Sequence, residues 1–188
     1  HGASAALLLG GFAALALAVV ALGYPAQRHY LHERFRNQVA DESIPGMDLD
    51  SAYRWARDQR DARIGLVGTT AGFAGYGFYG TDLSNRVRYL GAPGPHGAFN
   101  AIPTCAGFRA AVNAADLDYL VTAPFLNFLH PDKPISSPES RWLRGEQAVT
   151  PILREGQVTV WRVRGPLDPS GCGPANAPLR EIPNTPAR

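Results

Sequence analysis

The stretch "GYGFYG", residues 75–80, has the spacing of the glycine fingerprint G-x-G-x-x-G, which holds the pyrophosphate of NAD or FAD at the start of a helix. In the dinucleotide fold the first glycine follows the first strand directly, a helix begins within the motif, and an acidic residue comes about 20 positions later. Here "TTAGFA" separates the preceding apolar run from Gly75, and no acidic residue lies between Asp82 and Asp116. The sequence therefore predicts no cofactor at these glycines, but an aromatic loop at the carboxyl end of a strand.

Side chains of this loop are the candidates for binding a ligand, because open α/β sheets often bind ligands at the carboxyl ends of their strands. Tyr76 and Tyr79 suit stacking on a sugar or contact with a membrane surface, and the other interpretation is that they cover an edge of the sheet. Asp82, Ser84 and Asn85 form a polar turn that either hydrogen-bonds its own backbone or contacts a saccharide. We take these five residues as the candidate binding site.

Other residues with chemical potential are less well placed. His29, His32 and Glu33 have a spacing that can ligate a metal on a helix, but contact with lipid headgroups fits an anchor segment better. The sequence contains no Ser/His/Asp order, no metal-spaced cysteines and no phosphate loop. We therefore predict no metal site and no catalytic residue within these 188 residues.

The first part of the chain reads as a membrane segment. No charge occurs from Gly2 to Gln27, and the 22 residues Ala3 to Tyr24 are apolar almost throughout. As a helix they extend about 33 Å, enough to cross a bilayer core of about 30 Å. A signal peptide is the alternative, although a basic start is missing and the apolar stretch exceeds the usual length of about 15 residues. Residues 1–27 are predicted to span the bilayer, and the small residues in their first half favour packing against further membrane helices.

The remaining chain alternates between strand and helix patterns. Residues 28–47 are predicted to be a juxtamembrane anchor and linker, 48–168 an α/β domain, and 169–188 a largely disordered tail. The expected elements are a helix from Asp50, strands at 63–69, 86–91 and 118–124, helices at 104–115 and 138–144, and two strands around a turn at Glu155 and Gly156. The expected helix caps are an Asp or Ser for the first helix, Thr104 for the second, and the Ser directly before Pro138 for the third. This order predicts a three-layer, Rossmann-like α/β domain with an antiparallel edge hairpin. The net charge of +2 does not indicate a nucleic-acid partner.

Two features disagree on which side of the membrane this domain lies. Arg28, Arg34 and Arg36 follow the apolar segment, and the positive-inside rule places them in the cytoplasm. Cys105 and Cys172 lack metal-like spacing, and an even pair of this kind is typical of a structural disulfide in an oxidising compartment. Two unrelated buried thiols are the alternative. We favour a Cys105–Cys172 disulfide and an extracytoplasmic domain.

Several segments together resemble one recurring pattern: a membrane helix followed by "YPAQRHYLHERF", "AYRWARDQRDARIGLVG", "YGTDLSNRVRYLG" and "GPLDPSGCG". The chain resembles the C-terminal end of bacterial polytopic membrane proteins of the GT-C glycosyltransferase type, similar to the dolichyl-phosphate-mannose mannosyltransferase and ArnT-like groups. The resemblance implies transfer of a sugar from a polyprenyl-phosphate donor at the extracytoplasmic face. It also implies that the catalytic acidic residues lie in an early luminal loop outside this chain.

The resemblance thus predicts an accessory extracytoplasmic domain in the cell membrane, whose partners are the bilayer, the other membrane helices of the parent protein, and a polyprenyl-phosphate sugar or glycan acceptor. Two alternatives stay open. One is a non-enzymatic, membrane-anchored envelope domain that binds a glycan or protein partner, and the other is a secreted α/β enzyme behind a signal peptide.

Overall fold

The computed structural model describes residues 2–33, 48–68, 72–93, 99–125, 133 and 135–176. These belong to two compact units, His1–Val39 and Ala40–Arg188.

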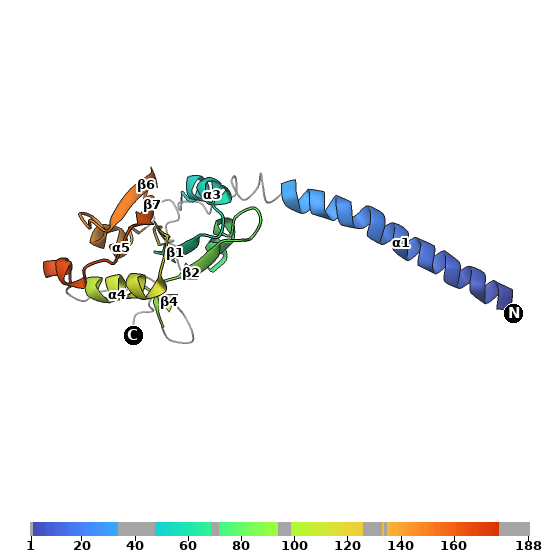
Figure 1. Cartoon of the computed structure of the whole chain (residues 1–188), viewed down its shortest axis with the longest axis horizontal. Helices are drawn as coiled ribbons and strands as arrows, with labels where there is room; N and C mark the ends of the chain where they lie inside the picture. Colours follow the sequence, from blue (N-terminus) through green and yellow to red (C-terminus); the bar gives the residue numbers. More distant parts are fainter. Residues whose placement is uncertain are drawn as a thin grey trace. The chain divides into compact units, whose positions relative to one another are not determined.

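The described residues of the first unit form one helix, α1 (Gly2–Glu33) (Figure 1). Its candidate membrane span is Leu9–His29, with a mean hydropathy of 1.8 and no residue buried within the protein. Pro25 lies inside the helix, which continues six residues beyond the predicted boundary at Gln27. By length and composition α1 is therefore a candidate membrane anchor. The predicted linker from residue 34 to residue 47 lies outside the described residues.

The second unit is a mixed α/β domain, as the sequence predicts. Its elements are α3 (Asp50–Arg57), β1 (Arg63–Val67), η2 (Gly72–Phe78), β2 (Arg86–Tyr89), β3 (Ala92–Pro93), β4 (Phe99–Asn100), α4 (Cys105–Ala115), β5 (Tyr119–Thr122), α5 (Pro138–Trp142), β6 (Val149–Glu155), β7 (Val158–Val163) and η4 (Pro169–Asn176). The five-stranded sheet has the order β2-β1-β5-β7-β6 (Figure 1). Strands β2, β1 and β5 are parallel, and β7 is antiparallel to both β5 and β6.

Two of the three helix starts follow from local sequence. The Thr104 side chain accepts a hydrogen bond from the backbone N–H of Gly107 and caps α4. Ser137 caps α5 in the same way, directly before Pro138. A serine or threonine oxygen at this position satisfies a backbone donor that the helix itself leaves unpaired. Both predicted caps are confirmed.

The predicted cap of α3 is wrong. Its N-cap residue is Leu49, which has no side-chain oxygen to accept a hydrogen bond and is fully buried. Asp50, expected as a cap, lies instead in the first turn, where its negative charge suits the helix dipole. Burial of the leucine side chain, rather than capping chemistry, fixes where this helix begins.

Both faces of the central strands are buried. On one face Leu120 and Trp161 are cross-strand partners and belong to a core that includes Phe108 of α4. On the other face Val121 and Val160 are partners, and both are 0% exposed. Burial on both faces explains why β1 and β5 read as continuous apolar runs rather than as alternating patterns.

The end of the domain lies further along the chain than predicted. The first eight residues of the predicted tail form η4, which packs against α4 and carries Cys172. Cys105 and Cys172 form a disulfide with their Cα atoms 5.9 Å apart, as predicted. Residues 177–188 lie outside the described residues.

Candidate functional site

The glycines at 75–80 serve packing and turn geometry. A side chain at Gly77 would collide with the ring of Tyr53, so η2 packs closely on α3 only because this residue is glycine. Gly80 has a φ of +79°, a left-handed conformation that glycine adopts without strain. These needs account for Gly77 and Gly80, whereas a side chain at Gly75 would meet only Val87 Cγ1 at 4.0 Å.

The predicted polar turn lies at the amino edge of the sheet, not at the carboxyl edge. Because β1 and β2 are parallel, the chain between them must return from the carboxyl end of β1 to the amino end of β2. Residues 79–85 form the last part of this return. The aromatic loop, expected at the carboxyl end of a strand, thus extends toward the amino edge by Tyr79, and Asp82, Ser84 and Asn85 lie where the chain enters β2.

Asn85 is a structural residue. It is 3% exposed, and its amide oxygen accepts a hydrogen bond from the backbone N–H of Ala62. Its amide nitrogen donates to the carbonyl oxygens of Ala56 and Phe78. These three bonds leave little capacity for a ligand, so Asn85 joins α3, η2 and β1 instead.

Asp82 and Ser84 are likewise used within the protein. Ser84 Oγ accepts a hydrogen bond from the backbone N–H of Asp61 at 3.0 Å. Asp82 forms an ion pair with Arg60 and accepts a hydrogen bond from the backbone N–H of Ser84. Hydrogen bonds from Ser84, followed by the charge of Arg60, lower the pKa of Asp82. The expected hydrogen bond to the turn's own backbone is present between Ser84 N–H and Asp82, whereas the bonds to Asp61 and Arg60 were not predicted.

Tyr76 and Tyr79 have no such role, because they are 67% and 37% exposed. Phe78, between them, is completely buried and packs edge-on against Tyr53. The structure thus separates the five candidate residues into three that hold the loop in place and two that face solvent.

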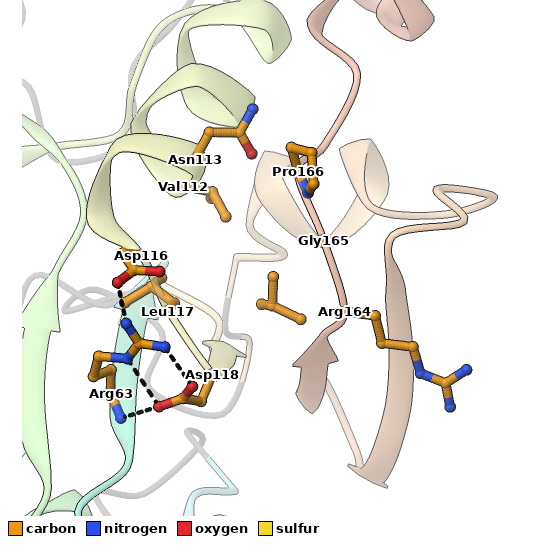
Figure 2. Close-up of a pocket in the computed structure, with 10 residues that line it drawn as sticks. Arg63, Val112, Asn113, Asp116, Leu117, Asp118, Arg164, Gly165 and Pro166 are labelled. Atoms are coloured by element: carbon orange, nitrogen blue, oxygen red, sulfur yellow. Dashed lines mark hydrogen bonds and ion pairs between the residues drawn. The ribbon is translucent and has the colours of Figure 1, made fainter.

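A pocket of about 370 Å³ lies at the same amino edge, between the starts of β1 and β5 and the end of β7 (Figure 2). Its lining includes Arg63, Asp116, Asp118, the half-buried Val163 and the exposed Pro166. Figure 2 shows the Arg63 guanidinium between the two aspartates, while the Arg164 side chain points away from them. The pocket therefore combines a charged wall with apolar side chains.

Arg63 and Asp118 form the electrostatic centre of this wall. Asp118 accepts hydrogen bonds from the Arg63 backbone N–H at 2.8 Å and from Arg63 Nη2 at 2.7 Å. Asp116 contributes a second ion pair to the same guanidinium. The hydrogen bonds from Arg63 lower the pKa of Asp118. Since the charges satisfy one another, this arrangement fixes two strand starts and offers no general acid or base.

A second depression, of about 280 Å³, adjoins the first at Asp118 and Val163. Here Arg162 donates to the Tyr119 hydroxyl at 3.3 Å and lies over its ring, with the guanidinium carbon 5.7 Å from the centroid. Gln59 and Asp61 complete a polar rim. The lining suits hydrogen bonding to a polar ligand rather than covalent chemistry.

Glu139 is the most deeply buried carboxyl group among the described residues. It is 1% exposed, and burial raises its pKa to about 7. Its Oε2 has no hydrogen-bond partner among the described residues. The charge of Glu139, added to burial, raises the pKa of Tyr89 to about 12. Nothing in the sequence pattern distinguishes this glutamate, because the first turn of a helix is an ordinary place for one.

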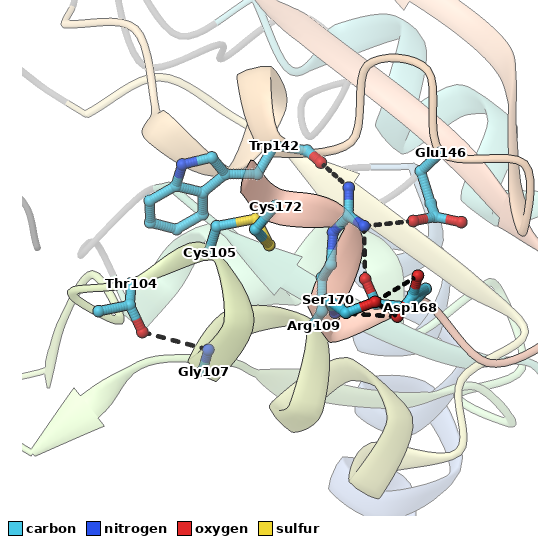
Figure 3. Close-up of a disulfide and its surroundings, with 9 residues drawn as sticks. All are labelled: Thr104, Cys105, Gly107, Arg109, Trp142, Glu146, Asp168, Ser170 and Cys172. Carbon is cyan, nitrogen blue, oxygen red and sulfur yellow. Dashed lines mark hydrogen bonds and ion pairs between the residues drawn. A yellow bond between two sulfur atoms is a disulfide. The ribbon is translucent and has the colours of Figure 1, made fainter. Parts of the chain in front are cut away.

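Arg109 lies beside the disulfide in a buried polar cluster that the sequence did not reveal (Figure 3). Its guanidinium donates to the carbonyl oxygens of Asp168 at 2.6 Å and Trp142 at 2.8 Å, and pairs with Glu146. The cluster ties α4, α5 and the segment before η4 together. The sequence signal for this cluster was Arg109 itself, a charged residue among the apolar residues of the predicted helix 104–115.

The part of the chain that the structure describes contains no group of three or more His, Cys, Asp or Glu placed to hold a metal ion. Comparison with family models, with curated proteins and with solved structures finds no match for this chain.

Proposed function

We propose that this chain is a membrane-anchored, extracytoplasmic accessory domain of a glycosyltransferase of the GT-C type, with the catalytic residues outside the chain. The observation that carries the proposal is the Cys105–Cys172 disulfide in a chain that begins with the apolar helix α1. Disulfides persist in oxidising compartments, so the pair favours the extracytoplasmic side. A helix that is uncharged from Gly2 to Gln27 favours anchoring in the cell membrane over cleavage as a signal peptide.

The site geometry supports an accessory role rather than a catalytic one. The amino-edge aspartates, Asp116 and Asp118, are engaged by Arg63, and Asp82 is engaged by Arg60. A domain of this kind helps to position a donor or acceptor by its surface. The glycosyltransferase assignment itself rests on the resemblance of the sequence segments, and the polyprenyl-phosphate sugar and the other membrane helices of the parent protein enter as its partners.

We also propose that the sheet belongs to the three-layer, Rossmann-like architecture, with β6 and β7 as its antiparallel edge hairpin. Three observations support this assignment: the parallel run β2-β1-β5, the placement of β6 at the end of the strand order, and burial on both faces of β5. Ring contact between Trp55 of α3 and Tyr119 of β5, with centroids 4.9 Å apart, is the packing expected where a helix covers a sheet.

Sidedness is tested by proteolysis of spheroplasts that express the chain. A membrane-impermeant protease added to spheroplasts digests residues 48–176 if the domain is extracytoplasmic and leaves them intact if it is cytoplasmic. Carbonate extraction tests the anchor separately, because a chain held by α1 stays with the membrane pellet. Release into the soluble fraction contradicts the anchor, and protection of the domain contradicts its sidedness.

The enzymatic context is tested by sugar transfer in membranes. Membranes from cells with the intact gene are compared with membranes in which Gly68→Val disrupts the domain, since a side chain at Gly68 meets the carbonyl oxygen of Ala123. We expect transfer from a polyprenyl-phosphate sugar to fall in the variant, and to disappear when the gene is deleted. Unchanged transfer after deletion contradicts the glycosyltransferase assignment.

A second candidate is a non-enzymatic envelope domain that binds a glycan or protein partner. It is favoured by the internal engagement of Asp82, Ser84 and Asn85, which leaves the loop with exposed aromatic rings rather than free polar groups. Unchanged sugar transfer together with capture of a specific envelope glycan selects this candidate.

A further inference from the structure

Exposed apolar side chains are concentrated in one short segment of the second unit. Among its described residues, five large apolar side chains are exposed: Tyr76 67%, Tyr79 37%, Leu83 69%, Ile135 42% and Ile152 43%. Three of these five lie between residues 76 and 83. We call Tyr76, Tyr79 and Leu83 the Tyr-Leu patch. Isolated exposed apolar residues are ordinary, whereas a local group of them indicates an interaction surface.

The backbone aligns the two tyrosines. The backbone N–H of Tyr79 donates to the carbonyl oxygen of Tyr76, which extends the 3₁₀ turn of η2 by one residue. A 3₁₀ helix has about three residues per turn, so side chains three positions apart lie on the same face. Phe78 turns into the core while Tyr76 and Tyr79 face outward.

Leu83 occupies an unusual position for its type. Its φ of 59° lies in the left-handed region, which strains a branched residue and favours glycine or asparagine. Packing does not offset this strain, because the side chain is 69% exposed. Contacts on both sides of Leu83 hold the turn in place: Asp82 forms an ion pair with Arg60, and Asn85 is buried in the domain. The fold therefore presents a leucine to the outside on a rigid support, and a strained, exposed position of this kind is a reason to look for function.

The patch segment itself carries no net charge. Within residues 76–83 the one charged residue is Asp82, and its ion pair with Arg60 neutralises it. A patch without net charge does not select an anionic partner. Tyrosine and leucine without net charge are instead typical of the interfacial zone of a bilayer, where an amphipathic ring places its hydroxyl at headgroup level.

We propose that the Tyr-Leu patch inserts into the interfacial zone of the bilayer that anchors α1; this inference rests on the membrane anchoring proposed above. About 14 residues join Glu33 to Asp48, and such a segment extends at most about 50 Å. A tether of this length keeps the patch at a high effective concentration near the bilayer. The patch therefore contacts lipid even when its affinity is too low for the untethered domain to bind a bilayer. A bilayer of zwitterionic phosphatidylcholine is a suitable partner, because the patch carries no net charge and does not need an anionic lipid.

Spin labels on the full chain in phosphatidylcholine nanodiscs test this contact. Both native cysteines form the disulfide and are 1% and 7% exposed, so a label attaches only to an introduced cysteine. Leu83→Cys reports on the patch, Ile152→Cys is the matched control on β6, and Leu17→Cys reports on α1. Collision with oxygen, which concentrates in lipid, is compared with collision with a polar nickel chelate.

We expect labels at positions 17 and 83 to collide more with oxygen and the label at 152 to collide more with the nickel chelate. Adding Tyr76→Ser and Tyr79→Ser to Leu83→Cys should return the label at 83 to water. Equal nickel accessibility at 83 and 152, with 17 in lipid, overturns the patch proposal and leaves the anchor standing. A label at 17 in water overturns the anchor. Shielding of position 83 from both reagents indicates a protein partner and also overturns lipid insertion.

Discussion

The guanidinium of Arg109 and the carboxylate of Glu146 form an ion pair with Nη1 2.6 Å from Oε2, and the two side chains are 6% and 10% exposed. The same guanidinium also donates to two carbonyl oxygens, so it serves three segments of chain. Removal of one partner of a buried pair leaves an uncompensated charge and costs about 3–5 kcal/mol.

We therefore expect Arg109→Leu to lower the free energy of unfolding by about 3–5 kcal/mol. The double variant Arg109→Leu, Glu146→Leu should recover part of this loss, because no charge is then left unpaired. Urea denaturation of the wild type, both single variants and the double variant measures the coupling. Additive losses would contradict a direct pair.

The disulfide should stabilise the domain through its unfolded state. The bond joins residues 67 positions apart, and the chain-entropy model gives about 4 kcal/mol for a loop of this size. The variant with both Cys105→Ser and Cys172→Ser should lose an amount of this order. Thermal unfolding with and without reductant checks it: reductant should lower the Tm of the wild type after full reduction and leave the variant unchanged.

The pH dependence of stability should carry a contribution from Glu139. Burial raises its pKa from 4.5 to about 7, so between these values the folded protein binds more protons than the unfolded chain. Stability therefore falls as pH rises through this window, by on the order of 3 kcal/mol in total. Glu139→Gln removes the titrating group, and its stability relative to the wild type should increase from pH 4 to pH 8. A constant difference across this range would show that Glu139 is not perturbed in solution.

Substitutions at Asn85 and Tyr76 should differ in their effect on stability, because Asn85 is buried and hydrogen-bonded whereas Tyr76 is exposed. Asn85→Ala removes the side-chain partner of the Ala62 N–H and of the Phe78 carbonyl oxygen, and one of the donors to the Ala56 carbonyl oxygen, which should cost about 2–4 kcal/mol. Tyr76→Ser, at a 67% exposed position, should change stability by less than about 0.5 kcal/mol. Denaturation of the two variants side by side checks the assignment, and equal losses would contradict it.

Local signals in the sequence were sufficient for most elements. Thr104 and Ser137 predict their helices correctly because a cap depends only on residues within one turn. The strand at 63–67 was evident as an apolar run that ends in glycine. The disulfide followed from the number and spacing of the cysteines alone.

The functional geometry depends on contacts that no local pattern contains. Arg63 and Asp118 are 55 positions apart, and their meeting follows from the strand order. The bonds of Asp82 to Arg60 and of Ser84 to Asp61 could not be read from the sequence, because they depend on β1 and β2 being neighbours. Glu139 is unremarkable until the fold buries it. The side chains were identifiable in the sequence, whereas their surroundings required the tertiary structure.

The disulfide also restricts the order of events during biogenesis. Cys172 comes after β7, the last strand of the sheet, so the bond cannot form until every strand has been synthesised and, for an extracytoplasmic domain, exported. An oxidase acting on the emerging chain therefore meets Cys105 without its partner until Cys172 follows it. The native bond thus comes after synthesis of the sheet strands, whichever of strand pairing and oxidation happens first in the complete chain.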